Sequence, residues 1–313
     1  MKDKNSCSKG NQPKFEQNGY WYKQDYLGYE GASEYVVSEI LKHSNISNFV
    51  SYEIVPVEFN NIVSNGCKSK NFLPPLTNIM TVEDIIRLSH NKTGTKFLDN
   101  KSTKERIETI VDLVEEYTGL NHFGEYLTTI LELDYLVLNE DRHLNNIAIL
   151  VSNDRKFDYC PIFDNGAAFL SDTHIDYPLD TPIRCHLNKV KAKPFSTDFS
   201  RQVEIAESLY GKQLQIEKDY FLPTQIKEEL SETYGQKIAS RIYVSNIAQQ
   251  QIYERFRSDN LMALSWEIES ENIKGSEREY EDEYEEYSYD RDDDDFDKEM
   301  DLDNNESDYD YEI

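Results

Sequence analysis

Hydrophobic positions recur at helical spacing along most of the chain after residue 80. One set falls at i, i+3, i+4 and i+7 and consists of Ile107, Ile110, Val111 and Val114. This spacing predicts an amphipathic helix, and Gly119 supplies its cap. The same criterion predicts further helices over 33–43, 123–138, 197–210 and about 238–256. Thr81, followed by Glu83 and Asp84, has the composition of another helix start.

Strand-favouring residues dominate the first eighty positions. The aromatic run 20–22 and the β-branched and aromatic run 49–57 predict strands on either side of the first helix. Ser64–Pro75, with the sequence SNGCKSKNFLPP, has loop composition and is predicted to connect two lobes. Two short strands, 147–151 and 157–163, are predicted after the helix at 123–138. This order predicts an α+β fold with a small β-rich N-lobe and a mainly helical C-lobe.

Acidic residues are concentrated at the C-terminal end of the sequence. Residues 267–313 contain 23 Asp and Glu against 4 Lys and Arg, a net charge of −19 out of −27 for the 313 residues. Such a segment buries too little apolar surface to offset its ordering entropy. We therefore predict a disordered acidic tail over 266–313, after a β-rich lobe over 1–78 and a helical lobe over 79–265. The remaining net charge of −8 offers nucleic acid no general attraction.

The sequence indicates no export and no membrane insertion. The start lacks a signal-peptide-like apolar stretch, and nowhere do 18 apolar residues follow one another. The four cysteines are far apart and form no CxxC pair, which favours reduced thiols in the cytoplasm. A partial metal site formed by Cys160, Cys185 and His186 is the alternative.

The densest polar cluster is NEDRHLNN at residues 139–146, between a predicted helix and a predicted strand. PIFDNG follows it one hairpin later and places Asp164 close to the same point in space. Phosphoryl transfer needs a carboxylate for the acceptor hydroxyl, and an amide oxygen and a second carboxylate for magnesium. Asn146 follows Asp141 by five positions, as in the catalytic loop of protein kinases. A solvated loop would explain the polarity but not this pairing.

The two motifs resemble those of HipA-like kinases, whose catalytic loop reads Asp-x-His-x-x-Asn and is followed by a metal-binding Asp after a short hairpin. The resemblance implies that Asp141 is the catalytic base and that Asn146 and Asp164 bind the metal. It also implies that His143 orients the reacting groups, although a structural histidine is the alternative. A similar Asp-Arg-His loop occurs in phosphoinositide kinases, so a lipid or small-molecule acceptor is a further alternative.

The same resemblance extends to the N-terminal residues, from about residue 10. Gly10, Gln12 and Lys14 match a Gly-x-Gln-x-Lys phosphate loop, although a simple turn would give the same pattern. The nine residues before Gly10 suggest a short stand-alone form. Lys9 stands where HipA toxins have a regulatory serine, which argues against self-inhibition at that loop.

Lys23 lies on the next predicted strand, where such kinases have a lysine that contacts phosphates. Glu34 best matches the acid that pairs with this lysine, with Glu30 and Glu39 as competitors, because glutamate on a helix is often only a helix former. After Asp164, the basic residues Arg184, Lys189, Lys191 and Lys193 could recognise an acidic or phosphorylated acceptor.

With these features, the resemblance implies a bilobal protein-kinase-like fold, with a nucleotide-binding lobe over 1–78 and a helical catalytic lobe over 79–265. It also implies an ATP- and Mg²⁺-dependent kinase acting on a protein serine or threonine. Autophosphorylation would be one form of this activity. The expected partner is a protein substrate, with no nucleic acid and no membrane, and an antitoxin-like partner is left open. The rival interpretations are a kinase of lipids or small molecules, and a nucleotide-binding pseudokinase or binding module. No Walker A motif is present, which disfavours a P-loop enzyme.

Overall fold

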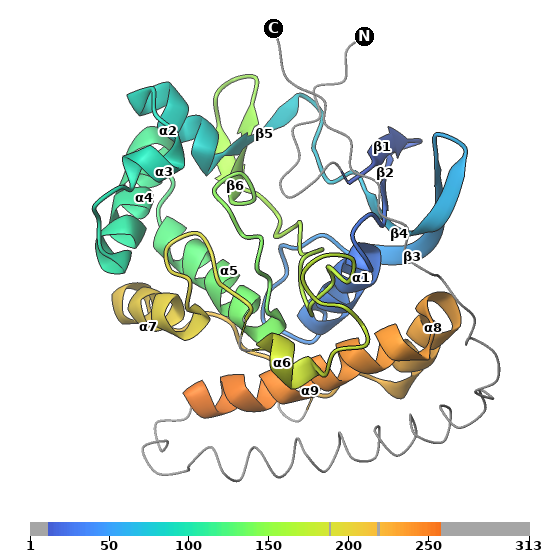
Figure 1. The fold of residues 1–313 in the computed structure, drawn as a ribbon. Helices are drawn as coiled ribbons and strands as arrows, with labels where there is room; N and C mark the ends of the chain where they lie inside the picture. The colour runs from blue at the N-terminus through green and yellow to red at the C-terminus, as the bar shows by residue number, and fades with distance from the viewer. Residues whose placement is uncertain (1–11, 188, 218–219, 258–313) are drawn as a thin grey trace, which may run out of the picture. The chain divides into compact units, whose positions relative to one another are not determined.

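The computed structural model describes residues 12–187, 189–217 and 220–257, which form two small antiparallel sheets and a set of helices (Figure 1). In chain order the elements are β1 Lys14–Gln17, β2 Tyr20–Gln24, α1 Glu30–Leu41, β3 Tyr52–Phe59, β4 Ile62–Lys70, β5 Thr77–Thr81, α2 Val82–His90, α3 Gly94–Phe97, α4 Thr103–Thr118, α5 Phe123–Val137, β6 Ala148–Ser152, β7 Phe157–Tyr159, α6 Ile183–Leu187, α7 Phe199–Tyr210, α8 Thr224–Tyr234 and α9 Gln236–Arg257. The predicted α+β class, with strands first and helices after them, is confirmed.

The first sheet has the strand order β1-β2-β4-β3, and all neighbours are antiparallel. Asn60 and Asn61 form the turn between β3 and β4 with φ values of 53° and 63°. Asparagine tolerates this left-handed conformation, which two-residue hairpin turns of this class require. β3 is an edge strand and can therefore contain Pro56, whose missing N–H is tolerated there.

The prediction of a loop over Ser64–Pro75 is wrong for its first half, because residues 62–70 form strand β4. This strand pairs with β2 on one side and β3 on the other, so its backbone groups are satisfied in two ladders. That pairing outweighs the polar composition of the segment. Gly66 is needed here, since a Cβ atom would lie 2.1 Å from the backbone oxygen of Lys23. Residues 71–76 form the remaining connection to β5.

The second sheet has the order β5-β6-β7 and leads into the helical lobe. β5, which the sequence pattern did not predict, pairs with β6 and runs directly into α2. The Thr81 hydroxyl accepts from the Asp84 N–H at 3.0 Å, and the Asp84 carboxylate accepts from the Thr81 N–H at 3.0 Å. This reciprocal capping box confirms the predicted helix start at Thr81.

Helix α5 lies at the centre of the helical lobe and packs against α4, α7 and α9 (Figure 1). Its side chains are buried on almost every face. The predicted apolar stripe of α4 is buried too, and that helix ends at Gly119 with a φ of 74°. α5 ends at Leu138, whose φ of 55° turns the chain directly into the polar loop 139–146.

One hydrophobic cluster includes buried residues of α1 together with those of α2, α4 and α5. The two lobes therefore share a core, and the predicted boundary at residues 78 and 79 stays a prediction. The predicted acidic tail, 266–313, lies outside the described residues. Within the described ranges, no helix has the length and apolar character needed to cross a bilayer.

Candidate active site

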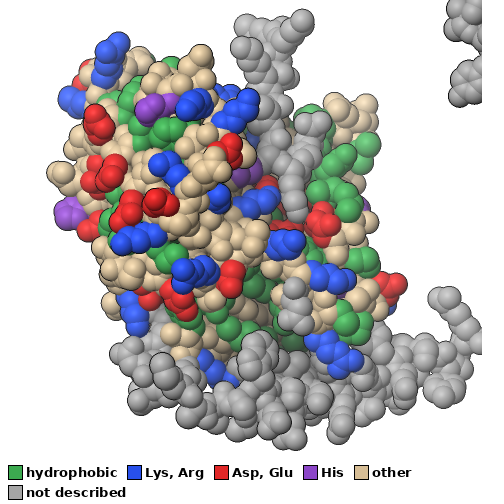
Figure 2. All heavy atoms as spheres, turned by 60° about the vertical axis from the view of Figure 1, so that its left-hand side comes forward, with side chains coloured by type: hydrophobic (Ala, Val, Ile, Leu, Met, Phe, Trp, Pro, Cys, Tyr) green, Lys and Arg blue, Asp and Glu red, His purple; other side chains and the backbone are tan. Residues whose placement is uncertain are grey.

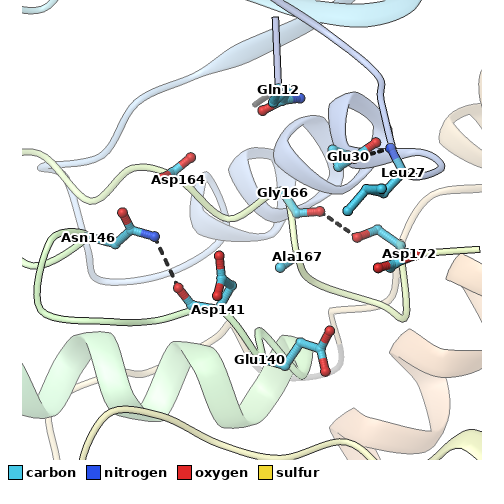
Figure 3. A pocket seen from close by; sticks show the side chains of 11 residues that line it. Gln12, Leu27, Glu30, Glu140, Asp141, Asn146, Asp164, Gly166, Ala167 and Asp172 are labelled. Carbon is cyan, nitrogen blue, oxygen red and sulfur yellow. Dashed lines mark hydrogen bonds between the residues drawn. The ribbon is translucent and has the colours of Figure 1, made fainter. Parts of the chain in front are cut away.

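The polar loop after α5 is held in place by its own hydrogen bonds. The Asn139 side chain donates to Asp134 at 2.9 Å, and the His143 N–H donates to the carbonyl of Asp141 at 2.9 Å. Asn146 donates from Nδ2 to the same carbonyl at 3.0 Å. Asp141 and Asn146 are each only 8% exposed, and both line a pocket (Figure 3). The loop therefore fixes two predicted site residues at one cavity.

Arg142 is fully buried and ties this loop to the segment that carries Asp164. Its guanidinium donates to both carboxylate oxygens of Asp134 at 2.9 Å and to the side chain of Asn165 at 2.6 Å. It also donates to the carbonyl of Phe163 at 2.9 Å. One buried side chain thus links α5, the loop 139–146 and the segment that carries Asp164. This role of Arg142 was not predicted from the sequence, although an arginine between two candidate residues was a visible signal.

Lys23 on β2 reaches across the site to Asp164. Its Nζ lies 2.9 Å from Oδ1 of Asp164 and 2.5 Å from Oε1 of Glu34 on α1. The other oxygen of Glu34 accepts from the backbone N–H of Asn165 at 2.8 Å. Three residues predicted from separate parts of the sequence therefore form one charged cluster.

The charges of this cluster depend on one another. Burial alone would lower the pKa of Lys23, but the carboxylates of Asp164 and Glu34 outweigh burial and raise this pKa well above its ordinary value. Burial alone would raise the pKa of Asp164, but the Lys23 ammonium outweighs it and lowers this pKa to about 2. Asp164 is therefore ionised throughout the neutral range. Its backbone has a φ of 62°, a left-handed conformation that aspartate tolerates better than most residues other than glycine.

Asn146 and Asp164 fit a magnesium ion of the kind that completes its coordination with substrate phosphates and water. Figure 3 shows the amide oxygen of Asn146 on the side that faces Asp164, and both residues line the pocket. In the described part of the chain, no group of three or more His, Cys, Asp or Glu side chains could hold a metal by itself. Magnesium is commonly held by one or two carboxylates and phosphate oxygens, so such a group is not required.

The described residues give no support to the alternative metal site at Cys160, Cys185 and His186. Cys160 is buried and Cys185 is exposed. The Nε2 atom of His186 lies 3.1 Å from the carbonyl oxygen of Pro178, a hydrogen bond that engages this ring nitrogen.

His143 lies next to the proposed base, with Nε2 3.9 Å from Oδ2 of Asp141. Burial lowers the pKa of His143, so its imidazole is neutral near pH 7. Both ring nitrogens are buried and have no hydrogen-bond partner among the described residues. A structural histidine normally has such partners. The orienting role of His143 stays a prediction.

The predicted phosphate loop is described only in part. Gly10 lies outside the described residues. Gln12 lines the pocket, and Lys14 is the first residue of β1, where it pairs in register with Lys23. The positive charge of Lys14 also contributes to the low pKa of Asp164. Gln12 and Lys14 therefore lie close to the cluster, and their contact with phosphates stays a prediction.

Glu30 and Glu39, the alternative candidates for pairing with Lys23, have other contacts. The carboxylate of Glu30 accepts from the backbone N–H of Leu27 at 2.7 Å and so fixes the turn before α1. Glu39 pairs with Lys42 at 2.5 Å on the surface of the same helix. Of the three candidates, Glu34 is the one in contact with Lys23.

The basic segment after Asp164 divides into two parts. Arg184, Lys189 and Lys191 are exposed, whereas the Nζ of Lys193 lies 2.8 Å from Oδ1 of Asp141. The face in Figure 2 shows basic and acidic side chains intermingled. The absence of a nucleic-acid partner and the binding of an acidic acceptor both stay predictions.

Comparisons with known proteins support the fold. No family model and no curated protein matches the chain. Its structure is similar to the crystal structure of a Helicobacter pylori proinflammatory kinase, CtkA, with a TM-score of 0.53 and 14% sequence identity. The likeness covers 80% of this chain and 91% of that chain. It shows that the chain has the two-lobed kinase-like fold predicted from the sequence.

Proposed function

We propose that this protein is an ATP- and magnesium-dependent kinase that phosphorylates a serine or threonine of a protein, in the manner of HipA-like kinases. One observation carries the proposal. Lys23 and Asp164, 141 positions apart in sequence, meet at 2.9 Å, and Asp164 lines the same pocket as Asp141 and Asn146. This combination of a cation, a metal-binding pair and a base is the set of groups that phosphoryl transfer requires.

Each residue has a role that follows from its surroundings. Asp141 accepts the proton of the acceptor hydroxyl as that oxygen attacks the γ-phosphorus of ATP. Lys23, held by the buried carboxylate of Glu34, binds phosphate oxygens. Asn146 and Asp164 hold the magnesium ion, which when bound supplies positive charge against the phosphates. Neutral His143 can donate one hydrogen bond to the reacting groups.

The location and the partners of the enzyme are part of the proposal. We place it in the cytoplasm, acting on a protein substrate or on itself, with no nucleic-acid or membrane partner. The lipid-kinase alternative rests on the Asp-Arg-His order at residues 141–143. An antitoxin-like partner is compatible with the proposal but no feature of the described residues calls for one.

A transfer assay with several acceptors tests the proposal. Purified protein is incubated with γ-labelled ATP and MgCl₂ in four arms: alone, with cell lysate, with casein and myelin basic protein, and with phosphoinositide vesicles. We expect label on serine or threonine of protein, and loss of this label in the Asp141→Asn variant. Label confined to lipid would support the lipid-kinase alternative. ATP binding without label in any arm would show a nucleotide-binding module.

Asp164→Asn is expected to weaken MgATP binding by about tenfold or more, because a carboxylate ligand of the metal is lost. Affinity for ATP in EDTA should change little, so the dependence on magnesium should disappear. Isothermal titration calorimetry with and without magnesium measures both values. Asp158→Asn, at an exposed position on β7, is the matched control. Unchanged MgATP affinity in Asp164→Asn would remove Asp164 from the metal site.

A further inference from the structure

Lys193 is held next to the proposed base by an anchored segment. The backbone carbonyl of Lys193 accepts from the buried side chain of Gln202 on α7 at 3.1 Å. Its neighbours Ala192 and Phe195 are buried, and the Ala192 N–H donates to the carbonyl of Thr197 at 3.0 Å. The backbone at Lys193 is therefore fixed, although its side chain is 41% exposed. This arrangement presents the ammonium to the pocket from a segment 52 positions after Asp141.

The contact with Lys193 gives the two carboxylate oxygens of Asp141 different surroundings. Oδ1 lies 2.8 Å from the Lys193 ammonium, whereas Oδ2 lies 3.9 Å from Nε2 of His143, outside hydrogen-bonding range. A base can accept a proton only through an oxygen that is free to meet the acceptor hydroxyl. The pairing at Oδ1 leaves Oδ2 available for this purpose and restricts rotation of the carboxylate.

Arg142 and His143, which also lie near Asp141 in the described part of the chain, do not take this role. The guanidinium of Arg142 is buried and bonded to Asp134 and Asn165. The Nε2 atom of His143 lies 3.9 Å from Oδ2 of Asp141, too far for a hydrogen bond. Lys193 thus supplies a cation to Asp141, and its ammonium is engaged there rather than free for an acidic acceptor.

We propose that Lys193 is the positioning residue of the catalytic base: it holds Oδ1 of Asp141 so that Oδ2 faces the acceptor hydroxyl. The inference rests on the proposed kinase function. As the acceptor oxygen bonds to the γ-phosphorus, the bond from that phosphorus to its bridging oxygen breaks and the electron pair leaves with ADP. The hydroxyl proton passes to Oδ2. Lys193 keeps its protons and neither gains nor loses a bond to the transferred group.

Two substitutions at this position separate charge from bulk. Lys193→Met removes the ammonium at similar length, and we expect kcat to fall by about 100-fold, the effect of misplacing a catalytic group by about 1 Å. The KM for ATP should stay within about threefold, because Lys193 does not touch the nucleotide in this role. Lys193→Arg keeps a cation and should retain about a tenth or more of kcat. Lys104→Met, at an exposed position on α4, is the matched control.

A double-mutant cycle tests whether Lys193 acts through Asp141. Adding Lys193→Met to Asp141→Asn should lower the remaining rate by less than about threefold, since the residue being positioned is already lost. MgATP affinity from calorimetry should be equal in all variants. The melting temperature should change by about 2 °C or less, because a partly exposed ion pair contributes little stability.

The outcomes separate this inference from the proposed function. Full kcat in Lys193→Met, with transfer still abolished in Asp141→Asn, would overturn the role of Lys193 and leave the kinase function standing. A higher kcat in Lys193→Met would also overturn it, because the lysine would then restrain the base. Equal losses in both backgrounds would show that Lys193 acts independently of Asp141. No transfer by the wild-type protein would overturn the kinase function and this inference with it.

Discussion

Asp141→Asn is expected to slow phosphoryl transfer by about 10²–10⁴-fold, the usual contribution of a general base. The asparagine side chain has the same shape and can still accept a hydrogen bond from Lys193, but it cannot take up the hydroxyl proton. MgATP affinity should be retained, because Asp141 serves the acceptor rather than the nucleotide. Initial rates under saturating MgATP, together with calorimetric affinity, measure the two effects separately.

Asp158→Asn on β7 is the control for this prediction too, since it makes the same chemical change at an exposed position. Its rate should equal that of the wild-type protein. If Asp141→Asn kept the wild-type rate, Asp141 would not be the base. If it instead lost MgATP affinity and kept its turnover at saturation, Asp141 would belong to the nucleotide site.

The helices were the part of the fold that the sequence predicted best, because their signals are local. The stripe on α4 requires only that residues three and four apart share a face, and Gly119 and Thr81 mark helix ends by their own conformations. Neither signal depends on the rest of the chain. For this reason the predicted and observed bounds of α5 differ by one residue at most.

The strands were harder to predict, because their pairing partners are distant in sequence. β4 contains few apolar residues and is stabilised by ladders with β2 and β3 on both sides. β5 is short, and it becomes a strand by pairing with β6, about seventy positions later. The local composition of β4 and β5 does not predict which strands they pair with.

In the site, too, contacts between residues close in sequence were predicted and contacts between distant residues were harder to predict. The spacing of Asp141, Asn146 and Asp164 is local, and the structure brings Asp141, Asn146 and Asp164 to one pocket. Lys193 meets Asp141 only because α7 and its preceding segment fold back on the loop 139–146. The spacing of residues in the sequence does not predict the contact between Lys193 and Asp141.

Arg142 illustrates a further limit, because its importance comes from burial. In the sequence it is one polar residue of a polar loop, whereas it is the largest fully buried side chain among the described residues. It satisfies the carboxylate of Asp134 and the carbonyl of Phe163 at once. Buried charges of this kind hold a site in one arrangement because leaving either partner alone is costly.

Arg142→Met should therefore destabilise the protein by about 3–5 kcal/mol, the usual cost of removing one partner from a buried ion pair. Urea unfolding measures the change. Arg87→Met, which removes an exposed partner of Glu83 on α2, should cost about 1 kcal/mol or less. A double variant, Asp134→Asn with Arg142→Met, should recover part of the loss, because no unpaired charge then stays buried.

The pH dependence identifies the cause of this loss. Burial raises the pKa of Asp134, and Arg142 opposes that rise in the wild-type protein. Without Arg142 the folded-state pKa of Asp134 rises further above its unfolded value, so the folded state binds more protons. Stability then falls as pH rises through the unfolded value toward the raised one. The deficit of Arg142→Met should thus be smaller at pH 5 than at pH 8, and the Asp134→Asn background should abolish that difference. An equal deficit at both pH values would mean that lost packing, rather than the stranded carboxylate, accounts for the instability.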